Sequence, residues 1–198
     1  MTNESLLKAA YKYFPQGIDA IVDRNSYTNS VEFKQLSDSC SYEFEKTEDG
    51  AYNSFFDAIQ NIDTSKYFFN ATHFHLNDRA HNLQLSELKD SKLYSICLNV
   101  SIIVPHYITY VLETDVSYPE DNFGLPQISK TVRSLEPEEK YRAIMDAMAA
   151  QTENFFDVTP FPEEKLQTIV PDISHETIRP GEFTFFNAFF LDDYYIMM

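Results

Sequence analysis

The sequence predicts an α+β fold in which a helical N-terminal part precedes an antiparallel sheet flanked by helices. Apolar residues recur every three or four positions in the first third, their period changes to two near residue 67, and helical spacing returns after residue 137. Helices and strands segregated in this way are typical of α+β domains. With 43% hydrophobic and 15% aromatic residues, the 198 residues can bury one core, so we expect a single domain over 1–198.

The first third contains three candidate helices. The first is expected to begin at a Thr2 or Asn3 cap, and the second at Asn29 or Ser30. The third follows a turn and is expected to be capped by Asp49. Their apolar faces would be formed by Leu6, Leu7, Ala10 and Phe14, then by Phe33, Leu36, Cys40 and Phe44, and finally by Tyr52, Phe55, Phe56, Ile59 and Ile62.

The middle of the chain has the alternation of a half-buried strand. From Tyr94 to Ile102 the even positions are apolar, and the same phase resumes after Pro105. We therefore expect one long bent strand, or two strands joined by a bulge near residues 104–106. Residues 67–76 and 82–88 are candidate partner strands, the latter connected to Leu93 by the polar turn 89–92. An antiparallel meander is the expected product.

The last third is expected to begin with a long loop or flap over residues 113–134, which contains two prolines and a glycine. Pro137 suits the first turn of a helix, and an apolar stripe extends that helix to residue 156. Residues 183–190 are apolar at both odd and even positions, which predicts a central strand buried on both faces.

The charge balance restricts the partners. There are 31 Asp and Glu against 15 Lys and Arg, a net charge of -16, and residues 101–198 are the more acidic half. Such a field repels nucleic acid and anionic lipid and attracts basic proteins, so we expect a basic protein partner, no nucleic acid and no membrane. The N-terminus lacks a cationic leader and no apolar run approaches the roughly 20 residues needed to span a bilayer, so we expect a cytoplasmic protein.

The sequence lacks the motifs of the common catalytic sites. Four glycines exclude GxGxxG and GxxxxGK phosphate loops, there is no GxSxG elbow, and Cys40 and Cys97 are too far apart for a CxxC pair. We therefore expect a non-enzymatic protein without a cofactor and assign no catalytic residue. Its oligomeric state stays open.

One cluster supports an alternative, a metal-dependent enzyme or metal-binding module. On a strand His73 and His75 would share a face, and two imidazoles at that spacing can bind one divalent metal. His81, Asp78 or the more distant His106 would complete the ligand set. HxH also arises on ordinary polar strand faces, so the cluster has a purely structural interpretation as well.

The acidic segment after residue 112 is the candidate partner-binding surface. Exposed aromatic rings inside a rim of carboxylates are typical of an interface in which the rim steers and the centre anchors. The residues expected to form it are Glu113, Asp115, Tyr118, Glu120, Asp121 and Phe123. An ordinary loop whose rings pack back onto the core would have the same composition.

Three short segments carry a resemblance. Residues 100–110, residues 185–193 and the opening segment 11–17 resemble small bacterial proteins that are encoded beside polymorphic-toxin genes and interpreted as immunity proteins. The resemblance implies a role, inhibition of a bacterial toxin, and assigns no functional residue. An acidic inhibitor would suit a basic toxin such as a nuclease.

Overall fold

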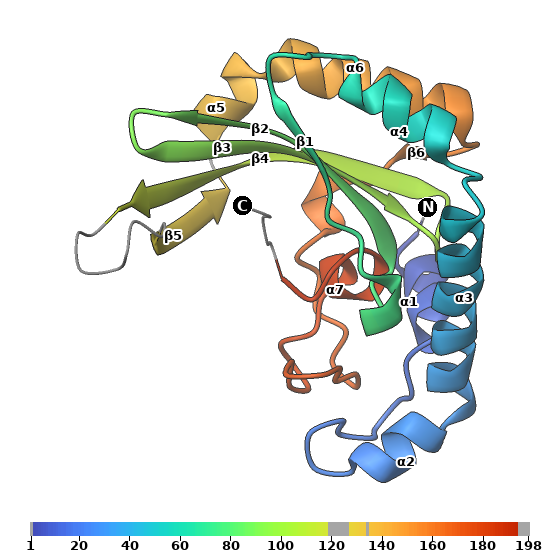
Figure 1. The fold of residues 1–198 in the computed structure, drawn as a ribbon. Coiled ribbons are helices and arrows are strands. Elements are labelled where there is room, and N and C mark those ends of the chain that lie inside the picture. The colour runs from blue at the N-terminus through green and yellow to red at the C-terminus, as the bar shows by residue number, and fades with distance from the viewer. Residues whose placement is uncertain (1, 119–126, 134, 194–198) are drawn as a thin grey trace.

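The computed structural model describes residues 2–118, 127–133 and 135–193 and confirms the α+β class (Figure 1). An antiparallel meander forms the sheet, in the order β1-β2-β3-β4-β5, and a short strand β6 pairs in parallel with β4. The strands are β1 (Tyr67–Asn70), β2 (Ala80–Lys89), β3 (Lys92–Ser101), β4 (His106–Ser117), β5 (Gln127–Arg133) and β6 (Thr159–Pro160).

Four helices precede the sheet, and the first three each start at a residue whose side chain caps the helix. They are α1 (Asn3–Tyr11), α2 (Arg24–Asn29), α3 (Val31–Glu48) and α4 (Asn53–Gln60). The Thr2 hydroxyl accepts a hydrogen bond from Ser5 N, and the Ser30 hydroxyl accepts one from Phe33 N, as N-caps do. The predicted Asp49 cap is wrong: Asp49 ends α3, and α4 begins after Tyr52 without a side-chain cap.

The turn between β2 and β3 lies where the polar residues predict it. Asp90 and Ser91 have φ angles of 52° and 61°, and Lys89 pairs with Lys92. Two consecutive residues with positive φ form the tight turn whose twist matches that of an antiparallel hairpin. The predicted partner strand 67–76 is shorter, because β1 ends at Asn70 and the chain then forms a 3-10 helix (Phe74–Leu76).

The predicted long bent strand is two antiparallel strands. The chain reverses over residues 102–105, where the Ser101 hydroxyl accepts hydrogen bonds from Ile103 N and Val104 N. The register places Val100 opposite Tyr107, so even positions of β3 share a face with odd positions of β4. The two even-numbered apolar sets therefore lie on opposite faces, and both strands are buried on both faces rather than half-buried.

Three further expectations are corrected after residue 112. The segment 113–134 contains the end of β4 and all of β5, because the two strands pair with each other. The long helix is divided at Tyr141 into α5 (Leu135–Lys140) and α6 (Arg142–Phe155). The predicted last strand is a helix, α7 (Phe185–Phe189), which starts with a capping box between Thr184 and Asn187.

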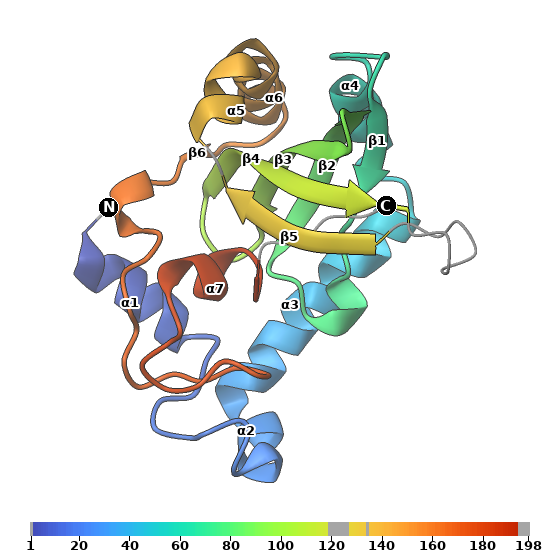
Figure 2. The same cartoon turned by 90° about the vertical axis from the view of Figure 1, so that its left-hand side faces the viewer.

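The helices cover the two faces of the sheet as separate layers. Leu83, Ile96 and Val111 face α4 and α6 in one apolar cluster, whereas Cys97, Tyr110 and Leu112 belong to a second cluster with α1, α3 and α7. Figures 1 and 2 show α4, α5 and α6 on one side of the sheet and α1, α3 and α7 on the other. Within the described residues, no helix has the length and apolar character needed to cross a bilayer.

Candidate functional site

The histidine cluster is not arranged as its spacing predicts. His73 and His75 lie in the irregular segment around the 3-10 helix, not on a strand; their ring centroids are 5.6 Å apart. His73 Nδ1 lies 3.9 Å from Asp78 Oδ2. His81 is buried on β2, with Nε2 4.0 Å from Glu43 Oε2. In the described part of the chain, no group of three or more His, Cys, Asp or Glu side chains is arranged to hold a metal ion.

His81 is enclosed by aromatic rings instead. The rings of Tyr52, Phe56, Phe74 and Phe156 have centroids between 4.6 and 6.2 Å from the imidazole centroid. This burial, together with the nearby Lys46 ammonium, lowers the pKa of His81 to about 3. His81 is therefore a neutral member of the core at physiological pH.

The structure describes three of the six residues that were expected to form the partner-binding surface. Glu113 and Asp115 lie in β4 rather than in a loop, and Glu113 forms an ion pair with Lys92. Tyr118 follows the strand and is 53% exposed. Glu120, Asp121 and Phe123 lie outside the described residues.

A cleft beside β4 is the best candidate for a binding site. β6 pairs with β4 only at His106 and Tyr107, and β5 pairs with it only from Leu112 onward. In the described structure no strand therefore pairs with residues 108–111 on this side. Phe161 N donates to Tyr107 O, so the backbone groups of Tyr107 point away from β3. Because these groups alternate in direction along a strand, the odd-numbered residues of β4 direct theirs toward the side on which residues 108–111 have no neighbour among the described strands. Thr109, an odd-numbered residue of this stretch, lines a cavity of about 340 Å³.

Charged side chains surround this open strand edge. Arg133, at the end of β5, donates from Nε to Glu138 at 2.6 Å and from Nη2 to Glu163 at 2.7 Å. Asp146 and Arg142 extend the lining from α6, where both are exposed. The cleft thus combines main-chain hydrogen-bonding groups with side-chain donors and acceptors, and three carboxylates outnumber its two guanidinium groups.

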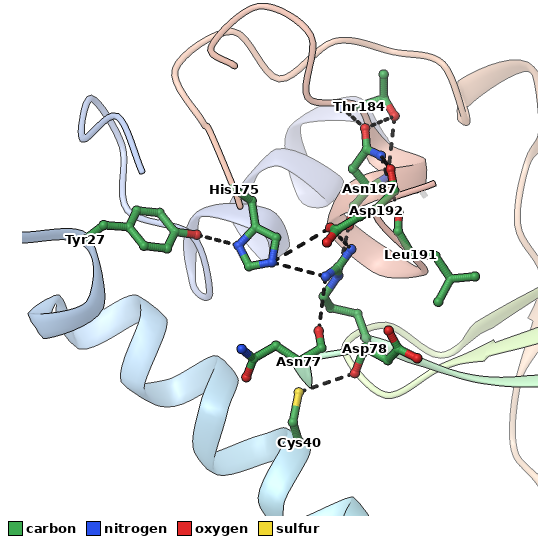
Figure 3. Close-up of polar contacts among 10 residues, drawn as sticks. Tyr27, Cys40, Asn77, Asp78, His175, Thr184, Asn187, Leu191 and Asp192 are labelled. Atoms are coloured by element: carbon green, nitrogen blue, oxygen red, sulfur yellow. Dashed lines mark hydrogen bonds and ion pairs between the residues drawn. The ribbon is translucent and has the colours of Figure 1, made fainter. Parts of the chain in front are cut away.

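A second polar cluster lies on the opposite side of the sheet, around the fully buried Arg79 (Figure 3). Arg79 donates from Nη2 to Asp192 Oδ1 at 2.6 Å, from Nη1 to Asn77 O at 3.1 Å, and from Nε to Asn187 O at 3.0 Å. His175 Nε2 lies 3.2 Å from Nη1, and His175 Nδ1 lies 2.7 Å from Tyr27 Oη.

The Arg79 cluster contains titratable groups in unusual states. Burial, with a smaller effect of the Arg79 charge, lowers the pKa of His175 to about 3. Burial likewise raises the pKa of the Tyr27 hydroxyl far above its usual range and that of the Cys40 thiol to about 12. His175, Tyr27 and Cys40 are consequently uncharged at neutral pH.

Sequence reasoning missed both sites. The cleft depends on where β5 and β6 stop pairing with β4, and no local pattern in the sequence marks these positions. The Arg79 cluster joins residues 27, 79, 175 and 192, which are far apart in the chain. One feature of the sequence pointed to the Arg79 cluster. Arg79 lies next to a run of strand residues, and a charged side chain that is buried beside a strand needs a partner of opposite charge or a hydrogen-bond acceptor.

Comparison with known proteins identifies no relative. The chain matches no protein-family model, no curated protein and no solved structure. The geometry of the two sites is therefore the basis for any functional assignment.

Proposed function

We propose that the chain is a non-enzymatic protein-binding domain that recognises a basic protein partner at the cleft beside β4. The single observation that supports this most directly is the edge of β4 at residues 108–111, along which neither β5 nor β6 pairs in the described structure and from which Ile108, Thr109 and Tyr110 line the cleft. An extended segment of a partner can add to such an edge through main-chain hydrogen bonds, while neighbouring pockets select its side chains.

The charge of the molecule favours a basic segment. The chain carries a net charge of -16, and Asp146 and Glu163 are exposed at the cleft. Carboxylates there would pair with lysine or arginine side chains of the bound segment and accelerate its association. The resemblance to immunity proteins gives this binding a role, the neutralisation of a basic toxin domain in a bacterial cell.

Binding of defined peptides tests the proposal. We would measure fluorescence polarisation of labelled extended heptapeptides that alternate apolar residues with either lysine or glutamate. The lysine peptides should bind more tightly, and their affinity should fall as salt increases. Asp146→Asn should weaken binding about two- to fivefold, the range of an exposed ion pair. Asp57→Asn, which removes an exposed carboxylate from α4, is the matched control and should change nothing.

A backbone variant tests the strand edge itself. Thr109→Pro removes an N–H group that faces the cleft and not β3, so the sheet keeps its ladder hydrogen bonds. Affinity should fall about two- to tenfold, the value of one hydrogen bond. Equal binding of lysine and glutamate peptides, or unchanged affinity in Thr109→Pro, would contradict recognition at this cleft.

The toxin role has a separate test. If a toxin gene adjoins the gene for this chain, an equimolar amount of the chain should abolish the activity of the encoded toxin domain, and Asp146→Asn should inhibit less well. An adjacent toxin that the chain neither binds nor inhibits would refute the role, whatever the result with peptides.

A further inference from the structure

The Arg79 cluster determines which ring nitrogen of His175 carries the proton. An arginine side chain can only donate hydrogen bonds, so His175 Nε2 must accept from Arg79 Nη1 at 3.2 Å. A neutral imidazole that accepts at Nε2 carries its hydrogen on Nδ1. Nδ1–H therefore donates to Tyr27 Oη, 2.7 Å away.

This assignment leaves the hydroxyl proton of Tyr27 without an acceptor in the cluster. Tyr27 Oη accepts from His175, and no further hydrogen bond of this oxygen is seen among the described residues. The side chain is only 3% exposed, so bulk water does not reach it freely. A buried donor that lacks an acceptor costs about 1–3 kcal/mol, so a binding partner is expected on the other side of the hydroxyl.

A cavity lies beside Tyr27 where that partner would bind. It has a volume of about 120 Å³ and is lined by Ala20, Arg24, Tyr27, Thr28, Phe33, Asn77 and Glu176. At about 30 Å³ for each water of the liquid, it accommodates roughly four waters or a ligand of four to five non-hydrogen atoms. It lies on the far side of the sheet from α6 and is distinct from the cleft beside β4.

The charged side chains of the cavity indicate the ligand's chemistry. Arg24 supplies a guanidinium group, which binds oxyanions through two parallel hydrogen bonds. The Arg79–Asp192 ion pair lies behind His175, so Arg24 is the positive charge that lines the cavity itself, while the exposed Glu176 in the lining opposes an anion. We infer that this cavity is a binding site for a small oxyanion, a carboxylate or phosphate, that accepts the hydrogen bond of the Tyr27 hydroxyl and pairs with Arg24.

The test is a nuclear magnetic resonance titration of the full chain with acetate and, separately, with phosphate. One of the two should shift the amide signals of Ala20, Thr28 and Glu176 in a saturable way at concentrations on the order of millimolar. Tyr27→Phe and Arg24→Gln should each weaken binding about tenfold. Glu176→Gln should tighten binding about two- to fivefold, because it removes a like charge.

Controls separate binding from loss of the fold. Arg24 is exposed, so Arg24→Gln keeps the cluster intact even if Tyr27→Phe disturbs it, and Tyr67→Phe is the matched control at an exposed tyrosine. Nitrogen-15 shifts of the His175 ring should report a protonated Nδ1. A proton on Nε2, or cavity amides that do not respond to saturating acetate or phosphate, would overturn the inference and assign the cavity to water.

Discussion

Acidification should destabilise this protein through its two buried histidines. In the fold, burial lowers the pKa of both His81 and His175 to about 3, from the ordinary histidine value of about 6.5. Between those values the unfolded chain binds a proton at each site and the folded chain does not. The free energy of unfolding therefore falls as the pH decreases below about 6.5, and the contribution of each neutral histidine is fully present only above it.

The size of the effect follows from the unfolded state. Between about pH 7.5 and pH 5.5, an imidazole with a pKa of roughly 6.5 goes from about 10% to about 90% protonated. This proton uptake stabilises the unfolded state by about 1–2 kcal/mol for each site. His81 and His175 together should thus lower the free energy of unfolding by about 3 kcal/mol, a large share of the stability of a typical domain.

Urea unfolding followed by circular dichroism at the two pH values measures this loss, and one substitution isolates half of it. Among the described residues His81 Nδ1 has no hydrogen-bond partner, and Nε2 lies 4.0 Å from Glu43 Oε2, so His81→Leu breaks no strong hydrogen bond seen there. On acidification the free energy of unfolding of the variant should fall by about 1–2 kcal/mol less than that of the parent. His75→Gln, at an exposed position, is the control and should behave like the parent. Equal losses in the parent and His81→Leu would refute the assignment of His81 as a buried neutral group.

Two further substitutions test the fold. Arg79→Met leaves the Asp192 carboxylate and two backbone carbonyls without their donor and should lower the free energy of unfolding in urea by about 3–5 kcal/mol. Arg142→Gln, at an exposed ion pair, should lower it by less than about 1 kcal/mol. A loss below about 1 kcal/mol for Arg79→Met would show that the Arg79 cluster does not stabilise the fold. Ser91→Gly relieves a positive φ of 61° in the β2–β3 turn and should raise stability by about 0.5–1 kcal/mol, seen as a higher Tm; an unchanged or lower Tm would contradict the turn geometry.

Two of the corrected predictions, the long bent strand and the last strand, share one cause. The even-numbered apolar residues of β3 and β4 keep one phase along the sequence, yet the reversal at residues 102–105 places them on opposite faces. Apart from the capping residues Thr184 and Asn187, residues 183–190 are apolar because both sides of the segment are buried, and such a run has no periodicity to distinguish a strand from a short helix. In a segment buried on both sides, the apolar period alone does not show which face each residue occupies, and an apolar run without a period does not show whether the segment is a strand or a helix.

The candidate sites, too, were predictable from the sequence only in part. The acidic surplus that motivates a basic partner is a property of composition and was readable from the chain alone. The spacing of His73 and His75 predicted a shared strand face, but the chain leaves β1 at Asn70 before it reaches them. The cleft beside β4 and the cavity beside Tyr27 are formed by segments remote in sequence and became visible only in three dimensions.

The sequence by itself determined the features that depend on near neighbours in the chain. The caps at Thr2 and Ser30, the turn at Asp90 and Ser91, the meander and the α+β class follow from local hydrogen bonding and from the change of apolar period. The tertiary structure decided which faces are buried, where β4 has no paired strand on one side among the described residues, and which groups accept hydrogen bonds from Arg79. Burial and long-range hydrogen bonds depend on which distant segments pack together, and no short stretch of sequence contains that information.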